Sequence, residues 1–189
     1  MTDMSRLGID FAGVHFKNPI VPASGTFGYG KEFEEFYPLS ELGGISVKGT
    51  TGTRRNGNLP PRIAETPSGM LNSVGLQNPG IDHFIAEELP YLKTKDTVII
   101  ANIAGSTAEE YREIAEKLDS TDVDMIEVNI SCPNVKAGGA AFGVSCEGAA
   151  HITGIVRKAT KKPVMMKLSP NVTSIADIAK ACEAEGADA

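Results

Sequence analysis

The sequence predicts an α/β protein of the (β/α)8 TIM-barrel type, truncated after about five βα units and preceded by an N-terminal hairpin. Short apolar runs alternate with segments of helical spacing, which is typical of parallel βα units. Polar residues follow every predicted strand, as in barrel enzymes, whereas an open doubly wound sheet gathers ligands at one switch point. The first strand lacks a following GxGxxG, so a dinucleotide-binding sheet has little support.

The first half is expected to begin with a hairpin, because residues 7–11 and 14–16 alternate around Ala12-Gly13. Residues 19–23 predict a buried strand that ends at Ser24, and residues 31–36 a short helix. A second strand covers 44–48, and a polar loop rich in Pro and Gly runs to about Pro79. Helical spacing then joins Ile81, Phe84, Ile85 and Leu89.

The second half repeats strand and helix three times. Strands are expected at 98–103, 125–128 and 163–168, and a helix at about 146–160. The helix after the first of these strands has its apolar face at Tyr111, Ile114, Ala115 and Leu118, with Ser106 and Glu109 as its capping box. The last helix places Ile175, Ile178, Ala179 and Cys182 on one face.

Composition narrows the class of protein. A net charge of −6 argues against a nucleic-acid surface, and no run approaches the ~20 apolar residues of a membrane span. Three cysteines without a CxxC pair indicate neither a disulfide framework nor a zinc site, and with no signal-peptide pattern they favour the cytoplasm. A barrel needs ~250 residues, so the 189 here are expected to be the N-terminal part of one barrel domain or a smaller fold.

Cys132 is the candidate base. It follows the strand at 125–128 and precedes Pro133, so a thiol sits where a strand opens into a loop. A lone cysteine is more often a buried apolar residue, and Cys146 and Cys182 keep that interpretation on helical faces. No histidine lies in the motif, so proton abstraction by Cys132 is favoured over a Cys–His nucleophile.

Two lysines at the ends of apolar strands predict an electron-rich ligand. Lys48 and Lys167 would each require an anionic partner if buried, although a lysine at a barrel rim can also extend to solvent. A reduced flavin or a substrate carboxylate fits between them. Asparagine side chains both donate and accept, which suits a flat ring with carbonyl and N–H groups; the candidates are Asn72, Asn78, Asn102 and Asn129, with Asn78 also a turn former.

Four segments taken together resemble the catalytic subunit of class 1 dihydroorotate dehydrogenases. They are 24–26 (SGT), 47–51 (VKGTT), 72–80 (NSVGLQNPG) and 129–134 (NISCPN). The run LQNPG at 76–80 resembles the type B, NAD-linked members more than the fumarate-using type A. The resemblance implies a flavoprotein oxidoreductase of de novo pyrimidine biosynthesis that converts dihydroorotate to orotate.

Carried over residue by residue, the resemblance implies FMN contacts at Ser24, Lys48, Gly49, Asn102, Asn129 and Lys167. It implies substrate contacts at Lys48, Asn72, Ser73, Val74, Gly75, Leu76 and Asn129. Cys132 would remove a proton from carbon 5 while hydride leaves carbon 6 for the flavin, and the loop from Ser131 to Phe142 would act as a lid. The phosphate site expected after later strands is absent.

The resemblance also implies a partner subunit with FAD and a 2Fe-2S cluster. This chain is not expected to hold the cluster itself, because three dispersed cysteines cannot supply its four ligands. A homodimer within a heterotetramer is the expected assembly. Two alternatives stay open: a related flavin barrel of the dihydropyrimidine dehydrogenase type, and an inactive truncated chain.

Overall fold

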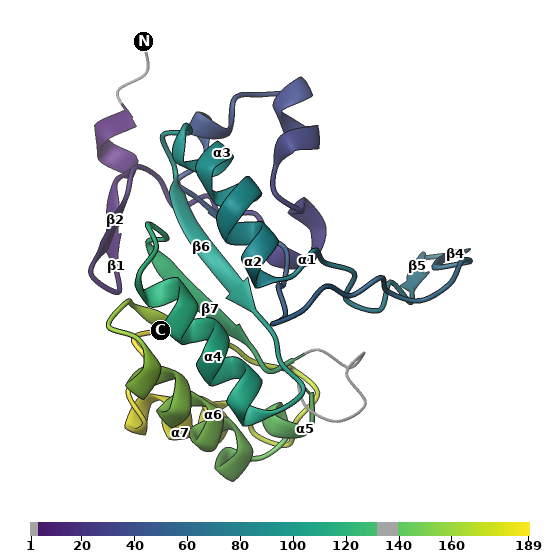
Figure 1. Ribbon diagram of the computed structural model, residues 1–189, viewed down its shortest axis with the longest axis vertical. Helices are drawn as coiled ribbons and strands as arrows, with labels where there is room; N and C mark the ends of the chain where they lie inside the picture. The colour runs from purple at the N-terminus through teal and green to yellow at the C-terminus, as the bar shows by residue number, and fades with distance from the viewer. Residues whose placement is uncertain (1–3, 132–139) are drawn as a thin grey trace.

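The structure, a computed structural model, describes residues 4–131 and 140–189 (Figure 1). Its centre is a four-stranded parallel sheet in the order β3-β6-β7-β8. The strands are β3 (Gly44–Ser46), β6 (Val98–Ile103), β7 (Met125–Asn129) and β8 (Val164–Lys167). Among these four parallel strands, neighbours in the sheet are also consecutive along the chain, which is the strand order of a (β/α)8 barrel wall.

Helices cover the outer face of the sheet. They are α4 (Ala108–Asp119), α6 (Cys146–Ala159), α7 (Ile175–Ala184) and a continuous helical stretch of α2 (Ile81–His83), a π-helical turn η4 (Phe84–Glu88) and α3 (Leu89–Lys93). Side chains such as Ile45, Ile126 and Val164 point outward and pack against these helices in the main core. None of the helices described is long and apolar enough to cross a membrane.

The inner face carries the alternate residues of each strand. Near the start of the strands it is apolar, because Ile100 and Met125 pack with Phe16 in a separate cluster. Phe16 belongs to the hairpin of β1 (Ile9–Phe11) and β2 (Val14–Phe16), which confirms the predicted hairpin and closes this end. Polar chemistry is therefore confined to the other end of the inner face, where the strands finish.

The predicted strand at 19–23 is wrong. The segment is irregular, and Ile20 and Val21 are exposed. Pro19 and Pro22 have no amide N–H, so they cannot complete a strand ladder. Its backbone link to β3 is the Ile20 carbonyl, which accepts from Gly44 N at 3.4 Å and from the preceding Gly43 N at 3.1 Å. The described sheet thus has four parallel strands where five were expected.

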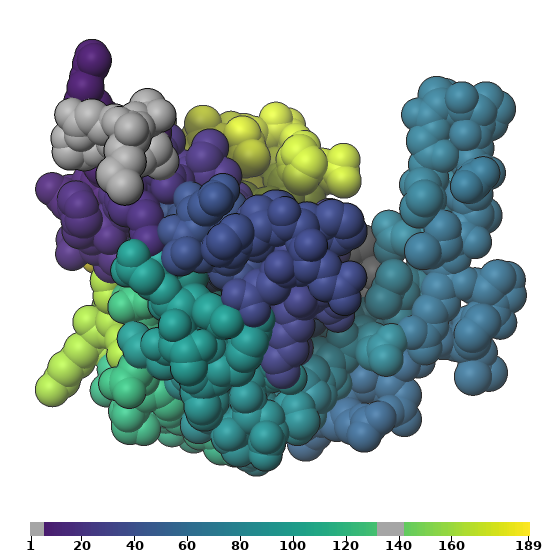
Figure 2. All heavy atoms as spheres, turned by 90° about the horizontal axis from the view of Figure 1, so that it is seen from above, coloured from purple at the N-terminus to yellow at the C-terminus, as the bar shows by residue number. Residues whose placement is uncertain are grey.

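The predicted loop before Pro79 contains a second hairpin. Strands β4 (Ile63–Thr66) and β5 (Gly69–Asn72) pair antiparallel, and every residue in them is exposed. The hairpin stands clear of the body as a projecting arm (Figures 1 and 2). Because both strands are exposed on both faces, their sequences carry no alternation of buried and exposed residues that would predict them. The remaining short elements are η1 (Met4–Leu7), α1 (Ser24–Phe27), η2 (Lys31–Glu35), η3 (Leu39–Glu41) and α5 (Ala140–Gly143).

Two helix details differ from expectation. The N-cap of α4 is Thr107, whose Oγ1 accepts from Glu110 N at 3.2 Å, so the capping pair lies one residue beyond the predicted Ser106 and Glu109. Glu110 reaches back to Ser106 N at 2.7 Å instead. In α7 Ile178 and Cys182 are buried, whereas Ile175 is 49% exposed and Ala179 is also exposed.

Candidate functional site

The carboxyl ends of the parallel strands bring the predicted lysines and asparagines onto the same inner face. Asn129 pairs with Lys167 in the sheet register, and Asn102 pairs with Glu127. Lys48 follows β3 two residues after Ser46, so it continues the same alternation. Four of the six predicted flavin contacts, Lys48, Asn102, Asn129 and Lys167, therefore share one edge and one face of the sheet.

A buried polar group lies below this edge. The Glu127 carboxylate accepts a hydrogen bond from Ser46 Oγ at 2.9 Å and a second from Asn102 Nδ2. Asn102 is 1% exposed and Glu127 is 8% exposed. Three strands thus contribute to one hydrogen-bonded group inside the barrel wall. Satisfying both donors offsets the cost of burying the carboxylate.

The other end of the Asn102 amide has no protein partner among the described residues. Its Oδ1 atom is buried without a hydrogen bond. Gly49 lies directly against it, because a Cβ on Gly49 would come within 2.7 Å of Oδ1 and 3.2 Å of Leu76 Cδ1. A buried acceptor left unsatisfied costs about 1–3 kcal/mol, which a ligand donor would recover. Asn102 and Gly49 therefore form a place suited to a ring N–H.

Asn129 and Lys167 are joined through Ser131. Lys167 Nζ donates to Ser131 Oγ at 2.7 Å, and Ser131 Oγ donates to Asn129 Oδ1 at 2.9 Å. Ser131 N also donates to Asn129 Oδ1, at 3.1 Å. Tyr111 of α4 fixes the strand end from outside by donating from its hydroxyl to the Asn129 carbonyl at 2.7 Å. With Oδ1 occupied, the Asn129 amide is oriented with its NH2 available as a donor.

Lys48 lines a basic cavity of about 410 Å³ beside the strand ends. Its lining residues include three cationic side chains, Lys48, Arg54 and Arg55, and one carboxylate, that of Glu32. This balance favours an anionic ligand. Burial raises the pKa of Tyr29, which also lines the cavity, to about 12, so its hydroxyl stays protonated at neutral pH.

The segment 72–76 is only partly brought to this site. Leu76 lies against Gly49 and packs with Ala104. Its φ of +53° is unusual for a non-glycine residue, and the Leu76 carbonyl is held by Asn78 Nδ2 at 2.9 Å. Asn72 and Ser73 are exposed at the base of the arm, where Ser73 Oγ accepts from Asn58. Val74 and Gly75, which connect Ser73 to Leu76, are half-buried.

Asn78 is confirmed as a structural residue of the turn. It is 4% exposed, its Oδ1 accepts from Thr51 N at 3.1 Å and from Gly80 N at 3.0 Å, and it ties the 72–80 segment to the chain that follows β3. Ser24 is buried at the start of α1. Cys132 lies outside the described residues, as does most of the predicted lid from Ser131 to Phe142.

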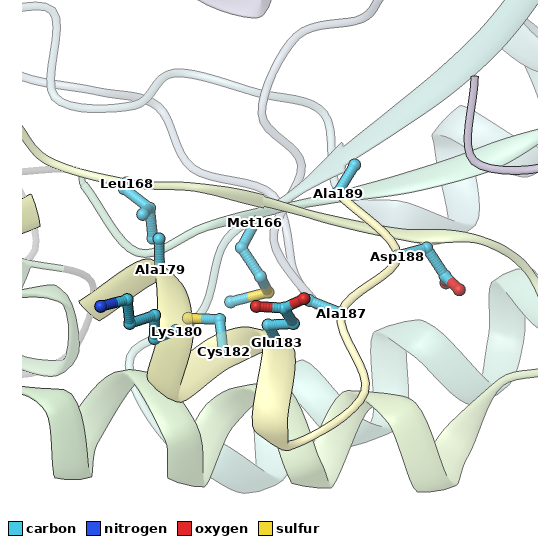
Figure 3. Close-up of a pocket in the computed structure, with 9 residues that line it drawn as sticks. All are labelled: Met166, Leu168, Ala179, Lys180, Cys182, Glu183, Ala187, Asp188 and Ala189. Atoms are coloured by element: carbon cyan, nitrogen blue, oxygen red, sulfur yellow. The ribbon is translucent and has the colours of Figure 1, made fainter. Parts of the chain in front are cut away.

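A second cavity, of about 300 Å³, lies away from these residues between β8 and α7 (Figure 3). Met166 of β8 and Cys182 of α7 face each other across it. The final residues border it: Asp188 N donates to the Val164 carbonyl at 2.8 Å, and the Ala189 carbonyl accepts from Met166 N at 2.9 Å. Its lining contains none of the predicted site residues.

Sequence reasoning missed Ser46 and Glu127. A signal for Glu127 was present, because a carboxylate inside the apolar run 125–128 lies two residues before Asn129 and so on the same face. Ser46 has the same relation to Lys48. The sequence does not indicate which side chain on another strand a single serine or glutamate will contact.

Comparison with known proteins agrees with this geometry. The family described as Dihydroorotate dehydrogenase matches residues 6–189. Proteins named Dihydroorotate dehydrogenase B (NAD(+)), catalytic subunit, are 55% identical in Petrotoga mobilis and in Anoxybacillus flavithermus, over 96% and 98% of this chain. The chain spans about 60% of the length of each of these relatives.

A solved structure shows the same fold. The DHODH of Eimeria tenella, crystallised with ferulenol, superposes with a TM-score of 0.81 over 98% of this chain and 58% of its own, at 19% identity. The described sheet and its outer helices are thus a part of the predicted (β/α)8 barrel. The names of the relatives also confirm the prediction of type B over type A. This chain belongs to the dihydroorotate dehydrogenase family.

Proposed function

We propose that the whole protein oxidises dihydroorotate to orotate in de novo pyrimidine biosynthesis, with FMN as the electron acceptor. Residues 1–189 would be the N-terminal part of a single FMN-binding barrel domain. The observation that carries the proposal is the buried Asn102 Oδ1 beside Gly49, which no described residue satisfies with a hydrogen bond. It lies at the strand ends, where Lys48, Asn129 and Lys167 also lie. The family membership makes this reaction preferable to oxidation of an uncharged pyrimidine.

The residues present fit a flavin ring. Asn102 offers an acceptor and Asn129 a donor, which matches a ring edge that carries both N–H and carbonyl groups. Lys48 and Lys167 place positive charge at the same edge, where they would stabilise a ring that becomes anionic. Gly49 lets a ring approach the backbone closely. When bound, FMN supplies the two-electron acceptor. We also propose a flavin contact at the buried Ser24.

The substrate is a small carboxylate. The basic cavity lined by Lys48, Arg54 and Arg55 supports its binding at this edge, with the segment from Asn72 to Leu76 as the proposed cover. Cys132 is the proposed base that removes the proton from carbon 5. It follows directly after Ser131, whose hydroxyl links Lys167 to Asn129.

We further propose a partner subunit that carries FAD and a 2Fe-2S cluster and passes electrons to NAD. The relatives are named as catalytic subunits, which supports a second kind of chain. The described residues contain no group of His, Cys, Asp and Glu that could hold a metal.

A homodimer is proposed because the exposed arm carries Ile63, Met70 and Leu71, apolar side chains available for contact with a second copy. We also propose a cytoplasmic location, which the free thiols of Cys146 and Cys182 support.

The test uses the complete gene product with bound FMN. Dihydroorotate is mixed with it under anaerobic conditions, and reduction of the flavin is monitored by stopped-flow absorbance. Cys132→Ala should slow flavin reduction by at least about 100-fold, the lower range for loss of a general base, while orotate binding changes little. Cys146→Ala is the matched control, because Cys146 is an exposed thiol at the start of α6. It should reduce at the parental rate.

Two results would contradict the proposal. Equal reduction rates in Cys132→Ala and the parent would remove Cys132 as the base. A complete gene product that binds no FMN, or whose flavin is reduced by dihydrouracil and not by dihydroorotate, would refute the proposed substrate and cofactor.

A further inference from the structure

We propose that Glu127 is a positioning residue, which sets the direction of the Asn102 side-chain amide so that an oxygen acceptor, and not the NH2 group, meets the ligand. The inference rests on the proposed function, because the ligand in question is the flavin ring. It concerns a different residue and a different property from the proposed chemistry at Cys132.

The argument starts from what a carboxylate can do. An ionised carboxylate has acceptors only, whereas a side-chain amide has an acceptor at one end and donors at the other. Asn102 Nδ2 donates to Glu127 Oε2 in the structure. Turning the amide over would place Asn102 Oδ1 against the carboxylate, with two acceptors facing each other in a buried site. Glu127 therefore holds the amide in one orientation.

Ser46 completes the arrangement from the neighbouring strand. Its hydroxyl donates to Glu127 Oε2 at 2.9 Å, so it holds the carboxylate without competing for the Asn102 amide. Ser46, Asn102 and Glu127 are 2%, 1% and 8% exposed, and their three strands are successive neighbours in one sheet. Bulk water is thus largely excluded from the position where it could take over these hydrogen bonds.

The consequence lies at the opposite end of the amide. Asn102 Oδ1 is buried and has no hydrogen-bond partner among the residues that the structure describes, and Gly49 has no side chain that would press against it. A fixed acceptor selects a ligand that brings a donor and disfavours one that brings a second acceptor. The oxidised flavin ring has one N–H, at N3. Glu127 thus selects for this N–H through Asn102 without contacting the flavin.

The experiment measures a ratio of two affinities. The apoprotein of the complete gene product is titrated with FMN and with FMN methylated at N3, and binding is followed by quenching of flavin fluorescence. In the parent, the methylated flavin should bind about 5- to 150-fold more weakly, because the buried acceptor is left without its donor. Asn102→Ala gives the reference ratio for a site with no acceptor.

Glu127→Met should lower the parental ratio toward that of Asn102→Ala, because the amide is then free to turn. Ser46→Ala is the matched control: it removes the second donor but leaves Glu127 on Asn102, so the ratio should stay parental. General damage to the site would weaken the binding of both flavins alike and leave the ratio of their affinities unchanged. In Glu127→Met the buried Ser46 hydroxyl loses its acceptor, which could prevent folding. If it does, the same ratio is measured in the double variant Ser46→Ala/Glu127→Met, which lacks that hydroxyl.

The outcomes separate the two proposals. A parental ratio in a folded Glu127→Met variant overturns the role of Glu127 while leaving the flavin site intact. If the parent binds both flavins equally well, Asn102 Oδ1 does not accept a hydrogen bond from the flavin N3–H, and the proposed role of Glu127 is overturned as well. A parent that binds neither flavin refutes the proposed function, and the inference falls with it.

Discussion

Replacing Gly49 with alanine tests the close approach at the centre of the candidate site. The backbone of Gly49 is not in the left-handed region, so an alanine can adopt its conformation and any effect comes from contacts. The added methyl would lie 2.7 Å from Asn102 Oδ1 and 3.2 Å from Leu76 Cδ1. Asn102 cannot easily move aside, because Glu127 holds its other end and the residue is 1% exposed.

The expected magnitude follows from overpacking. Forcing a methyl group into a filled interior costs about 1–3 kcal/mol, and the first contact here is shorter than ordinary van der Waals separation. We therefore expect Gly49→Ala to lower the free energy of unfolding by about 2 kcal/mol. Flavin affinity should fall as well, because the methyl group displaces Asn102 Oδ1, the acceptor proposed for the ring N–H.

The free energy of unfolding is measured by urea denaturation, monitored by circular dichroism. Gly25→Ala is the matched control, since a Cβ there meets nothing within 4 Å and its φ is also not positive. A second background isolates the contact: in Asn102→Ala the clashing oxygen is gone, so Gly49→Ala should cost at least about 0.5 kcal/mol less there. Equal costs in the two backgrounds, or a Gly49→Ala variant as stable as Gly25→Ala, would refute the packing argument.

Three further predictions concern the rest of the molecule. Thr107→Ala should cost about 0.5–2 kcal/mol of stability in urea unfolding by removing the cap of α4, and Thr107→Ser should restore most of it; an unaffected midpoint would contradict this cap. The pKa of Tyr29 is raised to about 12, so the folded state keeps a proton that the unfolded state releases. Stability should therefore fall as pH rises from about 10 to about 12, and Tyr29→Phe should reduce this fall; identical pH profiles would contradict it. On the arm, Met70→Ser with Leu71→Ser should weaken self-association in sedimentation velocity with little change in stability, whereas Phe36→Ser, 79% exposed elsewhere, should not; parental association would exclude the arm from the interface.

Elements with a full period of apolar residues were predictable from the sequence. The hairpin before residue 17, the strands at β6, β7 and β8 and the helices α4 and α6 all form where alternation or helical spacing placed them. The segment 19–23 failed for a specific reason: its residues are apolar enough for a strand, but two of the five are prolines without donors. The arm was missed for the opposite reason, since its strands bury nothing and so carry no burial pattern.

The residue types at the strand ends could be predicted without the structure. Lys48, Asn102, Asn129 and Lys167 follow apolar runs, and parallel strands must bring such positions to one edge. The orientation of those side chains depends on contacts between strands and could not be predicted. Glu127 meets Asn102 and Ser46 because three strands 25 to 81 residues apart fall into one register, and hydrogen-bond partners chosen across strands leave no local trace in the sequence.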